Sequence, residues 1–341
     1  MGQISQLIQR FLLVWLILLS LLAYSWPWFW ERSPLSEMVL LSAADPFLAS
    51  RSMLPALIAL TMFAIGSMLP HEEVNMVFRR WPLVLAGTAL QYLAMPLLAF
   101  SVGQLWRMEG DALVGLMIVG CVPGAMASNV LTLNARGNTS YSVGLTTVAT
   151  LLSPLVVPLA LGFTLVGAEA LSSETLWRTS GMLLLTVVLP VTVGHLLVRV
   201  FPKIQARARQ AGSLLANLVI LWIIAVVVGL NRERLSAMHA SLITALLTLN
   251  GLGYLAGYLG GWSLKLPESM RRALTLEVGM QNAGLGATLA TQLFPNRDGT
   301  AIAPALYTFG CMLTGTLLAQ LWKKITNDPR SPNDEFVGPA R

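Results

Sequence analysis

A single acidic side chain, Glu277, lies inside the long apolar stretch at residues 270–293. A carboxylate at the depth of a lipid bilayer costs at least ~2.5 kcal/mol on insertion scales, so it normally pairs with a cation, is hydrated or lines a functional cavity. Two glycines, an amide pair and a thioether follow it within seven residues. This composition weakens a helix and leaves backbone carbonyls free to coordinate an ion. The stretch predicts a broken transmembrane helix at a cation site; the alternative is a structural carboxylate hydrogen-bonded between helices.

A second stretch, residues 121–129, has a similar design. Its Pro-Gly centre at residues 123–124 weakens the helix, and the polar pair Ser-Asn at residues 128–129 follows, as Gln-Asn at residues 281–282 does in the first stretch. Two such helices that cross at the middle of a membrane would offer their half-helix amino termini to an anion and their free carbonyls to cations. The pair of stretches therefore predicts a transporter site.

The composition of the whole chain agrees with a membrane location for both stretches. Of the 341 residues, 55% are hydrophobic and only 11% are charged, and the mean hydropathy is +0.68. This is too little polar surface for a soluble globule, so we expect a polytopic membrane protein. The net charge of +6 comes from basic residues in short loops, without interleaved aromatic residues, so we expect no nucleic-acid partner. Cys121 and Cys311 both fall in apolar spans and form no C-x-x-C motif, so we expect neither a structural disulfide nor a thiol metal site.

Apolar stretches of about 17 to 25 residues predict ten transmembrane helices and an all-α fold. They are residues 11–29, 53–69, 82–104, 112–135 and 139–166, followed by residues 180–200, 212–230, 242–264, 270–293 and 300–321. We interpret the first as a helix rather than a signal peptide because it ends in the interfacial aromatic cluster of Trp26, Trp28, Phe29 and Trp30. The tail at residues 326–341 lacks apolar periodicity and is predicted to be disordered.

The distribution of basic residues predicts the orientation of these helices. If all ten span the membrane, 15 of the 22 basic residues lie on the side of the amino terminus. The seven on the opposite side are Arg32, Arg51, Arg107, Arg178, Arg232, Arg234 and Arg297. The positive-inside rule then places both termini, including the tail, in the cytoplasm, as an even number of spans requires. We expect a multi-pass protein of the cytoplasmic (inner) membrane.

The two broken stretches indicate an internal repeat within one transporter unit, residues 1–341. Each is the fourth predicted helix of its half, and the halves are residues 11–166 and 180–321. Because each half has an odd number of helices, the second half must insert upside down relative to the first. The sequence therefore predicts two inverted five-helix repeats whose discontinuous fourth and ninth helices cross.

Three motifs resemble the bile acid:sodium symporter family, in its bacterial type. They are Pro-Gly-x-x-Ala-Ser-Asn at residues 123–129, Ser-Val-Gly-Leu-Thr at residues 142–146 and Glu-Val-Gly-Met-Gln-Asn at residues 277–282, in a resemblance that covers nearly the whole chain. The resemblance implies a core domain around the crossing helices and a smaller panel domain. It also implies sodium-coupled symport of an organic anion by alternating access.

The resemblance implies two sodium sites. The first would comprise Ser128, Asn129, Ser142, Thr146 and Glu277; the second would comprise Gln91, Glu277 and Gln281, with the backbone carbonyls of Val278 and Met280. Sodium is a hard cation that suits hydroxyl, amide, carboxylate and carbonyl oxygens. Two hydroxyls one helical turn apart, at residues 142 and 146, also share one helix face. Taken singly, the hydroxyls and Gln91 could instead be interhelical packing groups.

The resemblance places the substrate at Ala125, Met126, Ala127 and Asn282. Where the family usually has Gly-Thr or Gly-Ser after Pro-Gly, this chain has Ala-Met at residues 125–126, and Cys311-Met312 replaces a frequent His-Asn pair. These departures predict a more apolar pocket and leave the anion, small or amphipathic, unnamed. The expected partners are this anion, Na⁺ as the coupling ion and the lipid bilayer. We expect no other cofactor, and no pattern indicates an oligomeric state.

Other classes of function are alternatives to symport. A proton-coupled organic acid carrier is one alternative, and an arsenite-type metalloid efflux carrier of a related fold is another. The latter would need an essential membrane cysteine, whereas Cys121 precedes Pro123 and lies outside the crossing motif. The chain has no His-Glu-x-x-His, no Gly-x-Ser-x-Gly and no paired intramembrane carboxylates, so we expect neither an enzyme nor catalytic residues. A sensor that binds the anion without transporting it would have the same sequence pattern.

Overall fold

The structure is a computed structural model that describes residues 11–32, 45–69, 81–166, 171–236 and 240–325, except for the side chain of Arg209. The predicted disordered tail lies outside these residues. The described part is helical, and its β-structure is limited to one isolated bridge between Gly124 and Gln281. The predicted all-α class is therefore confirmed.

Eight stretches of the described chain are long and apolar enough to span a membrane. Four are single helices, α2 (Leu12–Glu31), α7 (Trp81–Leu105), α10 (Thr139–Thr164) and α15 (Ala240–Ser263), and a fifth is Gln210–Leu230 of α13 (Gln205–Leu230). The stretch Pro46–Met68 comprises α4 (Pro46–Ala49), η1 (Ser50–Met53) and α5 (Leu54–Met68), and Ser173–Val200 comprises α11 (Ser173–Leu183), η2 (Leu184–Val188) and α12 (Leu189–Val200). The last, Asp298–Ile325, comprises η4 (Asp298–Ala301) and α18 (Ile302–Ile325). Two short elements, η3 (Pro202–Ile204) and α14 (Arg232–Ser236), flank α13. The protein is a multi-pass membrane protein.

The remaining two predicted segments are each divided into two short helices. The fourth forms α8 (Gly110–Cys121) and α9 (Ala127–Asn134), and the ninth forms α16 (Glu268–Gly279) and α17 (Ala283–Leu293). The prediction that these two segments are interrupted is thus confirmed, and the eight continuous apolar stretches of the described chain correspond to the other eight predicted segments.

The sixth predicted segment begins earlier than expected, at Ser173 instead of residue 180. Ser172 caps the helix by accepting a hydrogen bond from the Thr175 backbone N–H at 3.1 Å. The first turns are amphipathic, so hydropathy alone misses a start that the cap specifies. The turn of π-helix at η2 ends at Val188, two residues before Pro190. Because proline has no N–H, it removes a backbone hydrogen bond at this point, which accounts for the local irregularity.

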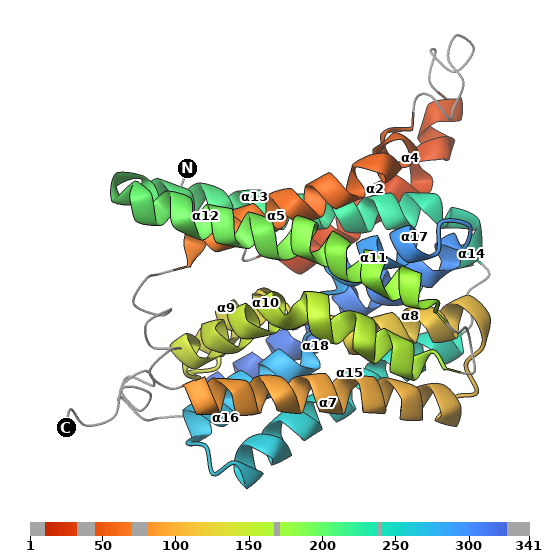
Figure 1. Ribbon diagram of the computed structural model, residues 1–341. Coiled ribbons are helices and arrows are strands. Elements are labelled where there is room, and N and C mark those ends of the chain that lie inside the picture. Colours follow the sequence, from red (N-terminus) through yellow and green to blue (C-terminus); the bar gives the residue numbers. More distant parts are fainter. Residues whose placement is uncertain (1–10, 33–44, 70–80, 167–170, 237–239, 326–341) are drawn as a thin grey trace, which may run out of the picture.

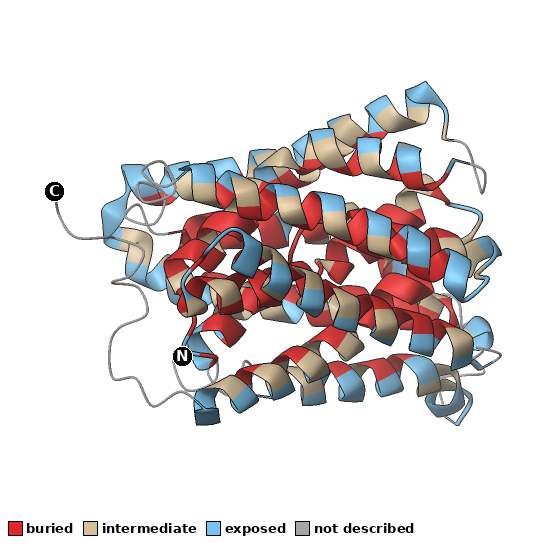
Figure 2. Ribbon diagram, turned by 90° about the horizontal axis from the view of Figure 1, so that it is seen from below, coloured by how far each residue is buried: buried red, intermediate tan, exposed pale blue. Residues whose placement is uncertain are grey.

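The helices form two groups, which Figure 1 shows one above the other. In the first, α5 packs on α12 and α13, and α13 also packs on α2. In the second, α7, α8 and α10 pack together with α15, α16, α17 and α18. Buried residues concentrate inside the bundle, and exposed positions follow the outer helix faces and the ends (Figure 2). Both interrupted segments belong to the second group, so the breaks lie within its buried interior.

Candidate functional site

The two helix breaks lie against each other as a short antiparallel pair. The backbone N–H of Ala125 donates to the carbonyl of Met280 at 2.7 Å, and the N–H of Asn282 donates to the carbonyl of Pro123 at 2.8 Å. Gly124 and Gln281 form the bridge between these bonds. Two backbone N–H groups and two carbonyls at the breaks therefore satisfy one another, as a buried backbone requires.

Gly124 brings the backbone of the first break close to Glu277 on α16. A Cβ atom at this position would overlap with the Glu277 carboxylate and would lie 3.2 Å from the Gln91 side-chain nitrogen. Gly124 has no left-handed backbone conformation. The glycine is therefore required by the close approach of the carboxylate and not by the backbone dihedral angles at this position.

One oxygen of the Glu277 carboxylate is held by two hydroxyls. Ser128 Oγ donates to Glu277 Oε2 at 2.6 Å, and Thr146 Oγ1 donates to the same oxygen at 2.7 Å. Glu277 is fully buried, and it forms no ion pair with a side chain in the described part of the chain. A buried carboxylate without a side-chain cation is suited to binding a cation from outside the protein.

The other predicted residues of the first site join the same network. Ser142 Oγ donates to Asn129 Oδ1 at 2.7 Å, and Thr146 Oγ1 lies 3.3 Å from that oxygen. All five side chains of the predicted first site are thus connected through hydrogen bonds. Sequence reasoning missed Thr132, whose Oγ1 lies 3.2 Å from Ser142 Oγ. Its position one turn after Ser128, on the same face of α9, could have identified it.

The second predicted cluster contains polar atoms that are buried without hydrogen-bond partners. They are both side-chain polar atoms of Gln91, the Gln281 side-chain oxygen and Glu277 Oε1. The three side chains are at most 1% exposed. An unpaired buried polar atom costs about 1–3 kcal/mol. Three of these four atoms are oxygens, which suit a site built for a hard cation.

The two backbone carbonyls predicted for the second site have partners at the break. The carbonyl of Met280 accepts from Ala125, as described above, and the carbonyl of Val278 accepts from the side-chain nitrogen of Gln281 at 2.6 Å. Because the partner of Val278 is a side chain, a rotation of that amide could release this carbonyl and present the amide oxygen instead.

The four predicted substrate residues line the amino termini of the second half-helices. Ala125, Met126 and Ala127 are half-buried at the start of α9. Asn282 is also half-buried, and its Oδ1 caps α17 by accepting from the Leu285 N–H at 3.1 Å. The two half-helix amino termini are therefore brought together at the crossing, where helix dipoles favour negative charge.

The two cysteines lie away from the predicted ligands. Cys121 Sγ lies 3.6 Å from Thr164 Oγ1, and Cys311 Sγ donates to the Thr308 carbonyl in its own helix at 3.5 Å. Among the described residues, no cluster of three His, Cys, Asp or Glu side chains could hold a metal ion. The candidate site therefore depends on neutral oxygens and one carboxylate.

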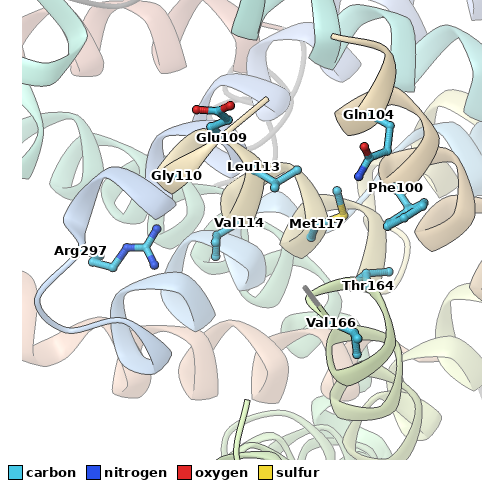
Figure 3. A pocket seen from close by; sticks show the side chains of 10 residues that line it. All are labelled: Phe100, Gln104, Glu109, Gly110, Leu113, Val114, Met117, Thr164, Val166 and Arg297. Atoms are coloured by element: carbon cyan, nitrogen blue, oxygen red, sulfur yellow. The ribbon is translucent and has the colours of Figure 1, made fainter. Parts of the chain in front are cut away.

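A surface cavity of about 410 Å³ is separate from this site. Figure 3 shows its lining, which combines apolar side chains of α7 and α8 with Arg297. Arg297 Nε donates to Asp111 Oδ1 at 2.7 Å. None of the predicted ligands lines this cavity, so it is a surface groove and not the candidate site.

Comparisons with known proteins point to one family of transporters. The family model described as "Sodium Bile acid symporter family" matches residues 55–238, more than half of the chain. The chain is 32% identical over 315 residues to the "Uncharacterized sodium-dependent transporter YocS" of Bacillus subtilis, which covers 91% of this chain and 90% of that protein. It is 30% identical over 270 residues to the "Probable sodium/metabolite cotransporter BASS1, chloroplastic" of Arabidopsis thaliana, over 78% of this chain and 66% of that protein.

A mammalian relative is more distant. The "Ileal sodium/bile acid cotransporter" of Oryctolagus cuniculus is 27% identical over 291 residues, which is 83% of each chain. These relatives are transporters, in agreement with the expectation of a transporter rather than an enzyme. The family match and the extent of the bacterial similarity show that the chain belongs to the Sodium Bile acid symporter family.

Proposed function

We propose that this protein is a sodium-coupled symporter of a small or amphipathic organic anion. The observation that carries the proposal is the division of the Glu277 carboxylate between two buried clusters. Its Oε2 accepts from the hydroxyls of Ser128 and Thr146, while its Oε1 is buried without a hydrogen-bond partner, as are the side-chain oxygens of Gln91 and Gln281. One carboxylate can thus serve two cations. The names of the relatives, which refer to sodium-dependent transport and sodium cotransport, support the choice of ion.

The first Na⁺ would bind among Ser128, Asn129, Ser142, Thr146 and Glu277. These groups offer three hydroxyl oxygens, one amide oxygen and one carboxylate oxygen, a ligand set typical of hard cations. In the structure the hydroxyls donate to Asn129 and Glu277. A bound cation would require the hydroxyl protons to turn away, so that their lone pairs face the ion.

The second Na⁺ would bind to the side-chain oxygens of Gln91, Gln281 and Glu277 and to the carbonyls of Val278 and Met280. The ion would satisfy the oxygens that lack partners in the structure. It would also replace the bond from the Gln281 nitrogen to Val278. Two cations and one carboxylate leave a net positive charge beside the crossing.

The anion would bind next to this positive charge, at the amino termini of α9 and α17. Ala125, Met126, Ala127 and Asn282 would contact it. Because Glu277 lacks a side-chain cation, the ions supply the charge that neutralises the substrate. Anion and sodium must then favour each other's binding, since thermodynamic linkage is reciprocal. This coupling is what a symporter requires.

We further propose that the ten segments form two inverted five-helix repeats. The group of α2, α5, α12 and α13 would be the panel, and the group that contains both breaks would be the core that moves against it. The position of a broken helix as the fourth segment in each half supports this division. The excess of basic residues supports cytoplasmic termini, and the bacterial relative supports a location in the cytoplasmic membrane.

The test is the thermal stability of purified protein, titrated with NaCl against KCl at fixed ionic strength. A ligand that binds the folded state raises its stability by RT ln(1 + [L]/Kd), which is about 1.4 kcal/mol at ten times the Kd. We expect a sodium-specific rise in wild type that disappears in Glu277→Gln. Glu174→Gln is the control, because Glu174 lies on the exposed surface of α11.

The outcomes separate the proposal from the alternatives. Identical curves in the two salts for wild type would refute sodium coupling; a response to pH would then favour the proton-coupled carrier, and a response to arsenite the metalloid carrier. A sodium response that persists in Glu277→Gln would show that the carboxylate is structural. A panel of organic anions then tests linkage: the same substrate Kd in sodium and in potassium would contradict symport.

A further inference from the structure

A buried polar cluster from α15 and α18 converges on one backbone carbonyl of the second break. Asn250 Nδ2 donates to the carbonyl of Gly279 at 2.7 Å, and the Tyr307 hydroxyl donates to the same oxygen at 2.7 Å. Both side chains are 1% exposed. Polar side chains in the middle of spanning helices are costly, so their placement calls for a reason beyond packing.

The amide of Asn250 is itself oriented by a second layer. Thr314 Oγ1 donates to Asn250 Oδ1 at 2.6 Å, which turns the amide nitrogen toward Gly279. The Tyr254 hydroxyl lies 3.1 Å from Thr314 Oγ1. Consecutive hydrogen bonds thus connect two spanning helices to the break, an arrangement that stiffens a buried site. The four residues that form them, which we call the clamp, are Asn250, Tyr254, Tyr307 and Thr314.

The other carbonyls of this break are held differently. Val278 accepts from the side chain of Gln281, Met280 accepts from the backbone of Ala125, and Gln281 accepts from the backbone of Ala283. In an unbroken helix the Gly279 carbonyl would accept from the N–H four residues later, which here bonds within the break. Side chains of other spanning helices therefore replace the lost helical bond of Gly279.

The clamp fixes the direction of the next carbonyl as well. Met280 is extended, with φ −112° and ψ 96°. Carbonyls on either side of an extended residue point to opposite sides of the chain. With the Gly279 carbonyl held toward α15 and α18, the Met280 carbonyl is turned toward the first break, where Ala125 donates to it.

We propose that Asn250, Tyr307 and Thr314 are positioning residues for the second cation site. They touch neither the ion nor the substrate. They hold the Gly279 carbonyl, and through the extended Met280 they set the direction of the Met280 carbonyl, which is a proposed ligand of the second cation. This inference rests on the proposed sodium coupling, and it assigns a role to side chains that the sodium ligands do not include.

The experiment measures the Na⁺ Kd from thermal stability in NaCl against KCl for four single variants. Tyr307→Phe and Thr314→Val each remove one hydroxyl of the clamp. Thr314→Ser keeps the hydroxyl and tests whether the hydroxyl alone is enough for the wild-type Na⁺ Kd. Thr316→Val is the matched control, because this residue on the same helix is also half-buried and donates only to the carbonyl of Met312 in its own helix.

Loss of a single hydrogen bond in the clamp should raise the Na⁺ Kd about threefold to tenfold in Tyr307→Phe and Thr314→Val. Thr314→Ser and Thr316→Val should keep the wild-type Kd. An unchanged Kd in Tyr307→Phe and Thr314→Val would overturn the positioning role, even if their stability fell equally in both salts, since an equal loss indicates packing alone. A wild type without any sodium-specific stabilisation would instead refute the proposed function, and this role with it.

Discussion

A methyl group added at Gly124 should weaken sodium binding. The new Cβ would overlap with the Glu277 carboxylate and lie 3.2 Å from the Gln91 side-chain nitrogen. The carboxylate has little freedom to move away, because Ser128 and Thr146 hold its other oxygen at 2.6 and 2.7 Å. The overlap therefore displaces either the carboxylate or the second cluster, both of which are proposed to bind Na⁺.

The magnitude follows from the cost of overpacking, typically ~1–3 kcal/mol in a well-packed interior. A cost of about 1.4 kcal/mol that falls on the sodium-bound state raises the Kd tenfold. At a sodium concentration of ten times the wild-type Kd, the stabilisation should then fall from about 1.4 to about 0.4 kcal/mol. The assay is the thermal stability of Gly124→Ala in NaCl against KCl.

Gly284→Ala is the control for this variant. Gly284 lies close to the second break, but a Cβ atom there would meet only Asn282 Oδ1 at 3.8 Å and Ile220 Cγ1 at 4.0 Å, which are ordinary contacts. We expect this variant to keep the wild-type sodium response. Equal sodium stabilisation in Gly124→Ala and wild type would refute the reasoning, because it would mean that the carboxylate and the second cluster take no part in binding the ion.

Three further predictions concern neighbouring groups. Thr132→Val removes a hydroxyl 3.2 Å from Ser142, so the Na⁺ Kd measured in the same thermal assay should rise about threefold; no change would exclude Thr132 from the site. Arg272→Gln removes a buried side chain that bonds the end of α9 and should lower the free energy of unfolding by about 1–3 kcal/mol in KCl. The control is Arg178→Gln, which breaks an exposed ion pair and should lower the free energy of unfolding by at most ~1 kcal/mol. Equal melting temperatures of the two variants would show that Arg272 does not stabilise the end of α9. Cys121→Ala should leave sodium-dependent uptake and arsenite resistance unchanged; a loss of arsenite resistance would favour the metalloid carrier.

Much of the fold could be read from local patterns. Long apolar stretches predicted the spans, since a bilayer admits only helices whose backbone groups are satisfied within the segment. The Pro-Gly at residues 123–124 and the Glu-to-Gln run at residues 277–281 predicted both interruptions. The early start of α11 was missed because a serine cap changes hydropathy very little.

The candidate site was predicted through motif spacing, but its connections were not. Ser128 and Thr146 donate to one oxygen of Glu277, while the other oxygen has no hydrogen-bond partner. This difference depends on side-chain directions in three helices, α9, α10 and α16. Thr132 could have been found from its helical spacing with Ser128. No local signal pointed to Asn250, since an isolated asparagine in a spanning helix pairs with whatever lies across from it.

The sequence by itself determined the membrane class, the approximate spans, the two breaks and the chemical types of the proposed ligands, because each of these follows from the residues within one segment. The tertiary structure alone decided how the breaks pair, which oxygen of Glu277 faces which cluster, and why position 124 must be glycine. These features depend on contacts between residues far apart in the sequence, such as Gly124 and Gln281, which are 157 positions apart. Such distances between side chains are set only when the helices pack, and no local pattern encodes them.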